Sequence, residues 1–244
     1  MNKKVLLNSD VGEEIGFDDQ ILPYVSWCNI ACGAHAGNED VIKKTIDLAL
    51  LNMAEIGAHP SYPDRENFGR KVMNISFNEL VATLTNQIFK VKTLTESAGG
   101  VLHHVKPHGA LYNEAMKNEE VARAILNAVK NVDASLYIIT QKESMISYLC
   151  DDHFRVRHEA FADRNYNEDL SLVSRLEKNA VLSDPEKVFN HVYTMVSDQK
   201  VKTIKGEERS IFFDTICVHG DTPKSVQILE YMHKRFLDLN FILK

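Results

Sequence analysis

The chain has 244 residues, of which 44% are hydrophobic and 25% charged. These proportions are ordinary for a globular protein and argue against long disordered tracts. With 28 basic and 34 acidic residues the formal charge is −6, which does not suggest the phosphate-neutralising surface of a general nucleic-acid binder.

No apolar run approaches the roughly 20 residues that a membrane span needs, and the N-terminal run is too short for a signal peptide. The four cysteines are too sparse for a disulfide framework in a chain of this length. We therefore expect a cytoplasmic protein with reduced thiols that binds neither nucleic acid nor a membrane.

Seven short β-type runs alternate with amphipathic helical patterns along the chain. The expected strands are residues 5–8, 27–31, 55–58, 101–105, 137–140, 155–158 and 214–218. Apolar stripes of helical spacing cover 77–91, behind a capping box at Ser76, then 188–196, behind Asp184-Pro185, and 229–239, after Thr222-Pro223. Residues 165–178 are polar and lack a period, which predicts a long surface loop.

This pattern predicts one domain over residues 1–244, of the α/β class. Seven βα-like units without a linker or an internal repeat favour a closed or nearly closed parallel sheet wrapped in helices. The expected architecture is a β/α barrel of about seven parallel strands. A doubly wound open sheet is the alternative.

Unusual polar residues stand at the ends of nearly all the expected strands. Because the carboxyl ends of parallel strands open onto one face, here called the barrel mouth, we expect these side chains to converge there. Five of the ten histidines lie at such ends, and together they favour a site although each alone is more readily structural. They are His35, His59, His108, His158 and His219, whereas His103, His104, His153, His191 and His233 are interpreted as structural.

Several chemistries fit these residues. Asp10, His35 and His59 are plausible ligands of a divalent metal, because carboxylate and imidazole suit several such ions. The alternative is an acid–base cluster without metal, since no HExxH-like spacing is present. Cys32 lies three residues before His35, which suggests a cysteine nucleophile activated by a histidine. A buried structural thiol at a strand end is the commoner case. Lys106, held extended by Pro107, can stabilise negative charge at the mouth, and the alternative is an ion pair with Glu159 or Asp163.

The chain contains neither a GxxxxGK[ST] motif nor a GxGxxG motif after a strand. If ATP takes part in its chemistry, a standard P-loop in this chain does not bind it.

The motifs together resemble those of the LamB/YcsF family. The similar segments are LNSDVGE (7–13), NIACGAHAG (29–37), GAHPSYPD (57–64), FGR (68–70), VKPHGALYN (105–113), EAFADR (159–164) and CVHGDTP (217–223). They follow the family's order and span almost the whole chain. The chain differs from the family's usual pattern in having Ser9 in place of Cys, and Glu14, Asn67 and Asn179 in place of Gly. Asn tolerates the left-handed backbone conformation, so the turns at Asn67 and Asn179 are expected to survive.

The resemblance implies a distorted β/α barrel akin to polysaccharide deacetylases, in which an Asp-His-His set binds metal. It also implies the A subunit of the ATP-hydrolysing 5-oxoprolinase, which cleaves 5-oxo-L-proline to L-glutamate with the B and C subunits. ATP would be a co-substrate of that complex, and a divalent metal bound by Asp10, His35 and His59 is a further possibility.

In this interpretation Asp10 or His59 is the general base, Lys106 with His35 and His108 stabilises charge on the former amide oxygen or a phosphate, and Arg70 clamps the substrate carboxylate. The expected catalytic residues are Asp10, His35, His59, Lys106 and His108. The expected substrate-binding residues are Asn8, Arg70, Tyr112, Asn113, Glu159, Asp163, Arg164, His219 and Asp221.

Two rival functions stay open. One is a stand-alone metal-dependent hydrolase of C–N bonds that uses Asp10, His35 and His59 as ligands. The other is a non-catalytic subunit that presents 5-oxoproline or a sugar to another chain.

Overall fold

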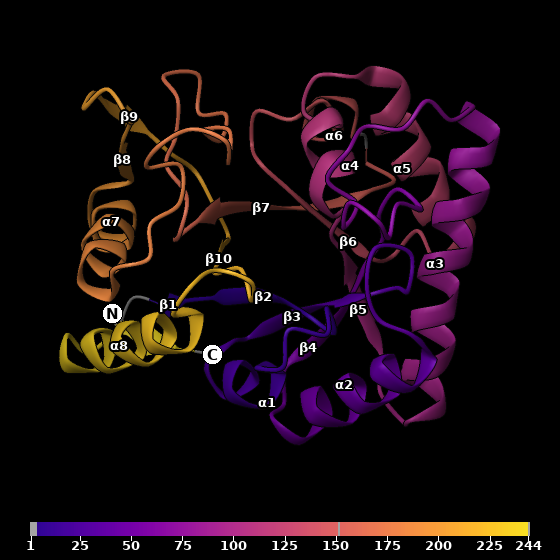
Figure 1. Cartoon of the computed structure of the whole chain (residues 1–244), viewed down its shortest axis with the longest axis horizontal. Coiled ribbons are helices and arrows are strands. Elements are labelled where there is room, and N and C mark those ends of the chain that lie inside the picture. Colours follow the sequence, from indigo (N-terminus) through magenta and orange to yellow (C-terminus); the bar gives the residue numbers. More distant parts are fainter. Residues whose placement is uncertain (1–3, 151, 244) are drawn as a thin grey trace.

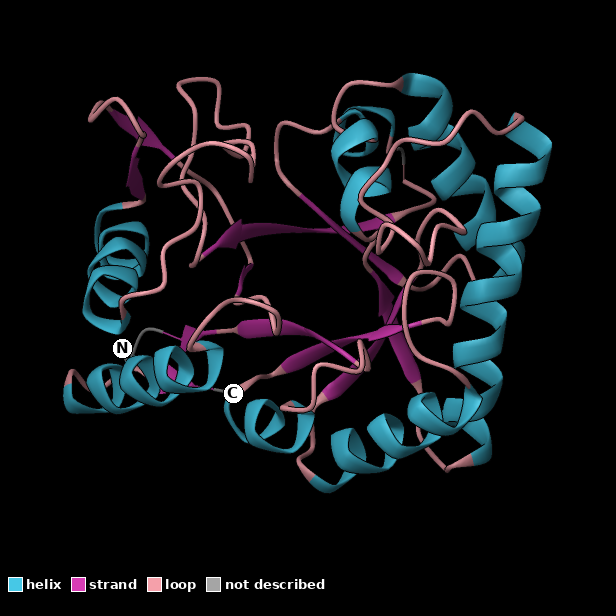
Figure 2. Cartoon of the chain, in the orientation of Figure 1, coloured by secondary structure: helices cyan, strands magenta, loops and turns pink. Residues whose placement is uncertain are grey.

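A computed structural model describes residues 4–150 and 152–243. Its centre is a closed barrel of parallel strands in the order β10-β2-β3-β4-β5-β6-β7 (Figures 1 and 2). These strands are β2 (Leu7–Val11), β3 (Trp27–Ala31), β4 (Glu55–His59), β5 (Leu102–Val105), β6 (Tyr137–Thr140), β7 (Arg155–Phe161) and β10 (Thr215–Cys217). The expected barrel of about seven parallel strands is confirmed, and the doubly wound open sheet is excluded.

Helices cover the outside of the barrel. Along the chain they are α1 (Asp18–Ile21), the 3₁₀ helix η1 (Leu22–Tyr24), α2 (Glu39–Leu51), α3 (Phe77–Ser97), α4 (Gly109–Glu114), α5 (Glu119–Val132), α6 (Met145–Leu149), α7 (Pro185–Asp198) and α8 (Ser225–Asp238). Figure 1 shows α2, α3 and α5 on one side of the barrel and α7 and α8 on the other. All three expected helices exist, and α3 begins after Ser76 as its capping box predicts.

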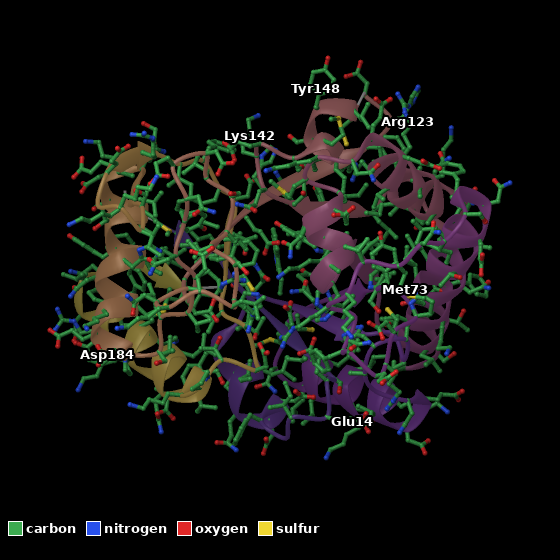
Figure 3. All side chains as sticks on the ribbon, turned by 45° about the horizontal axis from the view of Figure 1, so that its top comes forward. Glu14, Met73, Arg123, Lys142, Tyr148 and Asp184 are labelled. Carbon is green, nitrogen blue, oxygen red and sulfur yellow. The ribbon has the colours of Figure 1, made fainter. Side chains whose placement is uncertain are left out.

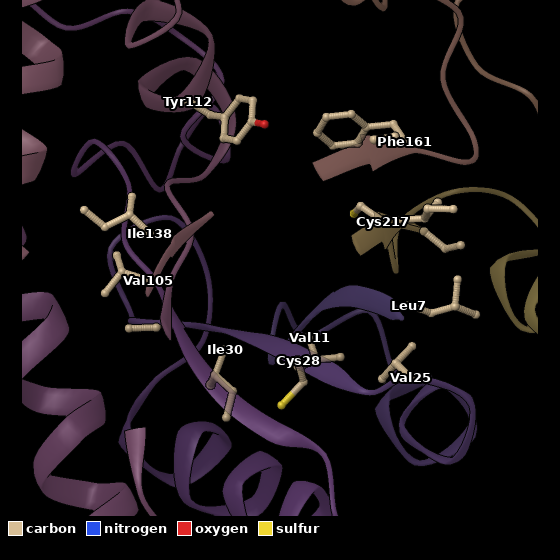
Figure 4. Close-up of a cluster of buried hydrophobic side chains, with 14 of the residues drawn as sticks. Leu7, Val11, Val25, Cys28, Ile30, Val105, Tyr112, Ile138, Phe161 and Cys217 are labelled. Carbon is tan, nitrogen blue, oxygen red and sulfur yellow. The ribbon is translucent and has the colours of Figure 1, made fainter. Parts of the chain in front are cut away.

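Every residue of β2 and β3 is buried, because helices cover one face of the barrel wall and packed side chains fill the other. The interior therefore has to accommodate polar side chains among apolar ones. Figure 4 shows part of the apolar packing, including Leu7, Ile30, Val105 and Cys217. Polar residues that reach this interior are costly to bury, so each needs a partner.

Two expected strands have boundaries that are wrong by more than one residue. The first expected strand is divided, because β1 (Lys4–Val5) leaves the barrel to pair with β11 (Ile242–Leu243), and β2 continues to Val11. The sixth expected strand continues three residues further, to Phe161. As a result Asp10 and Glu159 lie within strands and not after them, which places their side chains, like that of Asn8, on the barrel wall.

The expected loop at 165–178 contains no helix or strand, but its first turn is anchored. Tyr166 is fully buried, and its hydroxyl accepts a hydrogen bond from the Phe161 amide at 2.6 Å. Close by, β8 (Lys200–Lys202) and β9 (Glu208–Ser210) form an antiparallel hairpin. Asn179 has φ +65°, as expected for an asparagine in a glycine position, whereas at the other turn Phe68, next to Asn67, is left-handed.

No helix in the described parts of the chain is long and apolar enough to cross a membrane.

Candidate functional site

A buried lysine occupies the centre of the barrel mouth. Lys106 directly follows β5, and its Nζ lies 3.1 Å from Asp10 Oδ1, 3.1 Å from Glu159 Oε2 and 3.1 Å from Cys217 Sγ. Burial alone would favour the neutral amine, but Asp10, Cys217 and Glu159 raise the pKa of Lys106 well above its usual value. The ammonium therefore stays charged and neutralises the interior of the barrel.

Two side chains, Asn29 and Lys106, hold Asp10 in place. The Asn29 amide, in the middle of β3, donates to Asp10 Oδ1 at 2.8 Å and to Asn8 Oδ1 at 2.9 Å. Burial would raise the pKa of Asp10, but His59 and Lys106 outweigh it and hold that pKa well below the usual range. Asp10 is therefore an ionised carboxylate, fixed in position and nearly inaccessible to water.

Beside Asp10, three histidines surround the carboxylate of Glu13. Glu13 Oε1 lies 3.2 Å from His35 Nε2, 3.3 Å from His108 Nδ1 and 4.0 Å from His59 Nε2. His59 Nε2 is also 3.4 Å from Asp10 Oδ2. Burial and the nearby Asp10 carboxylate raise the pKa of Glu13 well above its usual value. We call Glu13, His35, His59 and His108 the histidine cluster.

Two clusters of polar side chains, one around Asp163 and one around Asp221, hold the rim of the mouth. Asp163 follows β7 and accepts hydrogen bonds from His219 Nδ1 at 2.8 Å and from the Thr222 hydroxyl. Asp221 pairs with Arg70 and, at 3.4 Å, with Arg175. Because Arg70 and Asp221 are 151 positions apart, this pair joins the loop after β4 to the loop after β10 across the rim.

Tyr112 and Glu159 lie near each other in the interior of the barrel. Tyr112 in α4 is buried, its ring meets Phe161 edge-on at 5.9 Å, and its hydroxyl points into the barrel (Figure 4). Burial and the Glu159 carboxylate raise the pKa of the Tyr112 hydroxyl well above its usual value. Neither Tyr112 Oη nor Glu159 Oε1 has a hydrogen-bond partner among the described residues. Buried polar atoms of this kind mark a place where a ligand or an ordered water belongs.

The structure thus brings together most of the expected site residues, but three stand apart. His158 lies in the middle of β7, bonds Ser147 at 2.9 Å and does not join the other histidines. Asn113 is exposed on α4. Arg164 is buried but turns into the following loop, donating to the Val173 carbonyl at 2.5 Å, and burial lowers its pKa to about 10.

Sequence reasoning did not select Glu13, Asn29 or Arg175 as site residues. A signal was present for two of them. Glu13 follows Gly12, whose φ of +72° turns the chain back toward the mouth, and Asn29 is a polar residue in the middle of a fully buried strand. Arg175 lies in the irregular loop, where nothing in the local sequence indicates its contact with Asp221.

Cys32 does not act as a nucleophile in this arrangement. It is fully buried, burial raises its pKa to about 12, and its thiol donates to the Ile30 carbonyl at 3.5 Å. It is a structural thiol at the end of a strand.

Two sets of side chains place potential metal-ligand atoms within 4.8 Å of one another in the described structure. One is the histidine cluster, and the other is Asp10, Cys217 and His219. The second set already has a cation, because Lys106 Nζ contacts both Asp10 and Cys217. The histidine cluster could hold a metal ion. Its acidic member is Glu13, whereas Asp10 is the acidic ligand expected from the sequence.

The fold and this site define a class of protein: a closed parallel β/α barrel with buried acids, histidines and a lysine gathered at the carboxyl ends of its strands. In that class, sites of this kind lie at the mouth of the barrel.

The chain belongs to the LamB/YcsF family, whose model matches residues 5–243. It is 40% identical to the A subunit of 5-oxoprolinase from Pyrococcus abyssi over 95% of this chain and 93% of that one. It is also 40% identical to the protein of the same name from Bacillus cereus strain 03BB102, over 94% of both chains. A crystal structure of the lactam utilization protein from Thermus thermophilus superposes with a TM-score of 0.93 at 34% identity, covering 99% of each chain.

Proposed function

We propose that this chain is the A subunit of an ATP-dependent 5-oxoprolinase and cleaves 5-oxo-L-proline to L-glutamate together with the B and C subunits in the cytoplasm. The observation that carries the proposal is the 40% identity, over 95% of the chain, to a protein named as that subunit. The buried charges at the mouth supply groups that this chemistry needs.

Opening a five-membered lactam demands activation of the carbonyl, because amide resonance opposes attack by water. Transfer of the γ-phosphoryl group of ATP to the amide oxygen, with release of ADP and of the amide proton, would give an imidate phosphate, which water attacks readily. Expulsion of the ring amine, which takes up a proton, breaks the C–N bond and leaves an acyl phosphate, and a second water hydrolyses it to L-glutamate and phosphate. The chain must then orient a water, accept its proton and stabilise negative charge on the oxygen. The sequence contains no standard P-loop, so we assign ATP binding to the assembled complex.

Of the two candidate bases, Asp10 fits better than His59. The Asp10 carboxylate is ionised and held by Asn29 and Lys106. His59 donates from Nδ1 to the Lys106 carbonyl at 2.6 Å, which fixes its ring, and its Nε2 faces the carboxyl groups of Asp10 and Glu13 at 3.4 and 4.0 Å. In the proposed reaction Asp10 therefore accepts the water proton, and His59 positions it.

Lys106 is suited to stabilise the negative charge that develops on the former amide oxygen or on the phosphate. It is cationic and buried, so its field is little screened by water. Arg70 on the rim is suited to the substrate carboxylate. For Arg70 to bind that carboxylate it must release Asp221, its partner in this structure.

Tyr112 and Glu159 complete the substrate site in this proposal. The unpaired Glu159 Oε1 is an acceptor for a ligand N–H, and the Tyr112 hydroxyl is a donor for a ligand oxygen. A lactam offers both groups side by side. We also assign Asn8, Asp163, His219 and Asp221 to this site, whose walls and rim they form.

The test is release of glutamate from 5-oxoproline and ATP, measured with and without chelator. We expect activity when the chain is combined with its co-expressed partner subunits, and none from the chain alone. Hydrolysis of the lactam by the isolated chain without ATP would contradict the proposal and favour the stand-alone C–N hydrolase. Unchanged activity in an Asp10→Asn complex would favour the non-catalytic, presenting role.

A further inference from the structure

The orientation of three imidazole rings in the histidine cluster is fixed from outside the cluster. The Ser61 hydroxyl donates to the Tyr62 carbonyl at 2.8 Å, so it accepts from His35 Nδ1 at 2.9 Å. His59 Nδ1 donates to the Lys106 carbonyl at 2.6 Å. In each of these two rings the outer nitrogen therefore carries the hydrogen.

In His108 the outer nitrogen is Nε2, which donates its hydrogen to the Phe68 carbonyl at 2.9 Å. In the neutral rings the inward nitrogens of His35, His59 and His108 consequently all carry a lone pair and no hydrogen. They face one another and Glu13 Oε1. His108 Nδ1 and His59 Nε2 are only 3.0 Å apart, a distance at which two lone pairs repel unless a cation lies between them.

The spacing of these atoms matches a tetrahedral ion. An ion bound at about 2.0–2.1 Å keeps its ligand atoms about 3.3 Å apart. Among Glu13, His59 and His108 the separations are 3.0, 3.3 and 4.0 Å. Imidazoles whose outer N–H groups donate to backbone carbonyls are the usual arrangement around a bound metal.

The fourth member of the cluster does not fit the same ion. The rings of His35 and His108 stack with centroids 3.8 Å apart and planes inclined by 2°. Their ring lone pairs lie in two parallel, separate planes, so the two rings cannot both point straight at one ion. Only one of them can be a ligand, and His108 is the one that lies close to both Glu13 and His59.

We propose that Glu13, His59 and His108 bind one divalent transition-metal ion, with an open fourth position and with His35 stacked beside the ligands. Three protein ligands with an open position are the pattern of catalytic rather than structural zinc sites. Two nitrogens and one carboxylate oxygen favour Zn²⁺ over Mg²⁺, which prefers oxygen ligands. The proposal concerns metal binding and stands independently of the substrate.

The proposed set differs from the Asp10, His35 and His59 set expected from the sequence. Asp10 Oδ1 is already shared by Lys106 and Asn29, and Asp10 belongs to the other set of potential ligands. Glu13, three residues further along, takes its place. Asp10 thus remains a base while Glu13 serves as the ligand.

The test uses the full-length chain, stripped with chelator and then titrated with Zn²⁺ or Mg²⁺ alone. Calorimetry and elemental analysis should show one Zn²⁺ per chain and much weaker binding of Mg²⁺. Co²⁺ in place of Zn²⁺ should give the intense visible bands of a tetrahedral site, a readout that needs no substitution. Absence of Zn²⁺ binding to the wild-type chain would overturn the proposal.

Four variants identify the ligands, each checked for folding by circular dichroism. Glu13→Gln and His108→Phe should weaken Zn²⁺ binding by more than about 100-fold, beyond the 10–100-fold cost of losing an outer hydrogen-bond partner. His35→Phe keeps the ring stack and should stay within about 10-fold of wild type. His103→Gln, outside the cluster, is the matched control and should bind like wild type. Loss in His35→Phe equal to or greater than that in His108→Phe would refute the assigned set.

Discussion

At the scale of single residues, the chemistry of the site rests on charges that are buried but compensated. Lys106, Asp10 and Glu159 are almost inaccessible, and Lys106 is the cation that contacts both carboxyl groups. Removing one partner leaves an uncompensated charge, so stability and activity are coupled here. Conservative substitutions are therefore needed to separate the two.

Asp10→Asn is such a substitution, because it keeps the shape and removes the charge. We expect kcat of the reconstituted complex to fall by about 10²–10⁴-fold, the usual contribution of a general base, while KM changes little. Steady-state kinetics of glutamate release measure both constants. A large rise in KM with unchanged kcat would show instead that Asp10 binds substrate.

A second residue-scale prediction concerns Gly57, whose lack of a side chain makes room for a buried histidine. A Cβ there would lie 2.1 Å from His104 Nε2, which also bonds Asn29 Oδ1 at 2.8 Å. Gly57→Ala should destabilise the protein by at least about 1–3 kcal/mol through overpacking. The free energy of unfolding in urea measures this cost.

The control is the double variant with His104→Ala, which removes the clashing ring. Its destabilisation should be smaller than the sum of the two single effects by about 1 kcal/mol or more. Strict additivity would show that the ring does not cause the cost.

At the scale of elements, the helix starts were readable from the sequence because capping is local chemistry. Asp184 precedes Pro185, the first residue of α7, and its side chain accepts from the Lys187 amide at 3.0 Å. Asp184 lies at the edge of the molecule (Figure 3), so few other contacts depend on it.

Asp184→Ala should therefore cost about 1 kcal/mol of stability, the usual value of an N-cap. Asp184→Asn, which keeps an oxygen acceptor, should cost much less. Denaturant midpoints of the two variants decide the matter. Equal destabilisation by both would mean that charge, and not the cap bond, stabilises the start of α7.

The span of the strands was harder to predict, since pairing across the barrel decides it. Asp10 stays within β2 because it pairs with Asn29 in the β3 ladder, and Glu159 stays within β7 because it pairs with Thr215. Neither partner is near in sequence. Polar residues that look like loop residues were therefore built into the barrel wall.

At the scale of the whole molecule, stability depends on histidines that are buried uncharged. His191 in α7, which is half-buried, is an example away from the mouth, and desolvation lowers its pKa to about 4. Between pH 6.5 and 4 the unfolded chain binds a proton here that the folded protein does not. Stability is thus complete above about pH 6.5 and falls by up to roughly 1.4 kcal/mol per pH unit for this one group on acidification.

His191→Gln should flatten that part of the dependence. The measurement is the free energy of unfolding of both proteins at a series of pH values between about 4 and 7. Parallel curves for the two proteins would show that His191 does not contribute to acid destabilisation.

The sequence by itself determined the barrel class, the positions of three of its helices and most of the residues at the mouth, because periodicity, capping and strand-end polarity are local patterns. Tertiary structure alone decided which residues meet. It brought Glu13 among three histidines, paired Arg70 and Arg175 with Asp221, and left His158 and Asn113 outside. Those outcomes depend on strand register and loop paths, which are set by packing between segments up to about two hundred residues apart, and no local pattern encodes them.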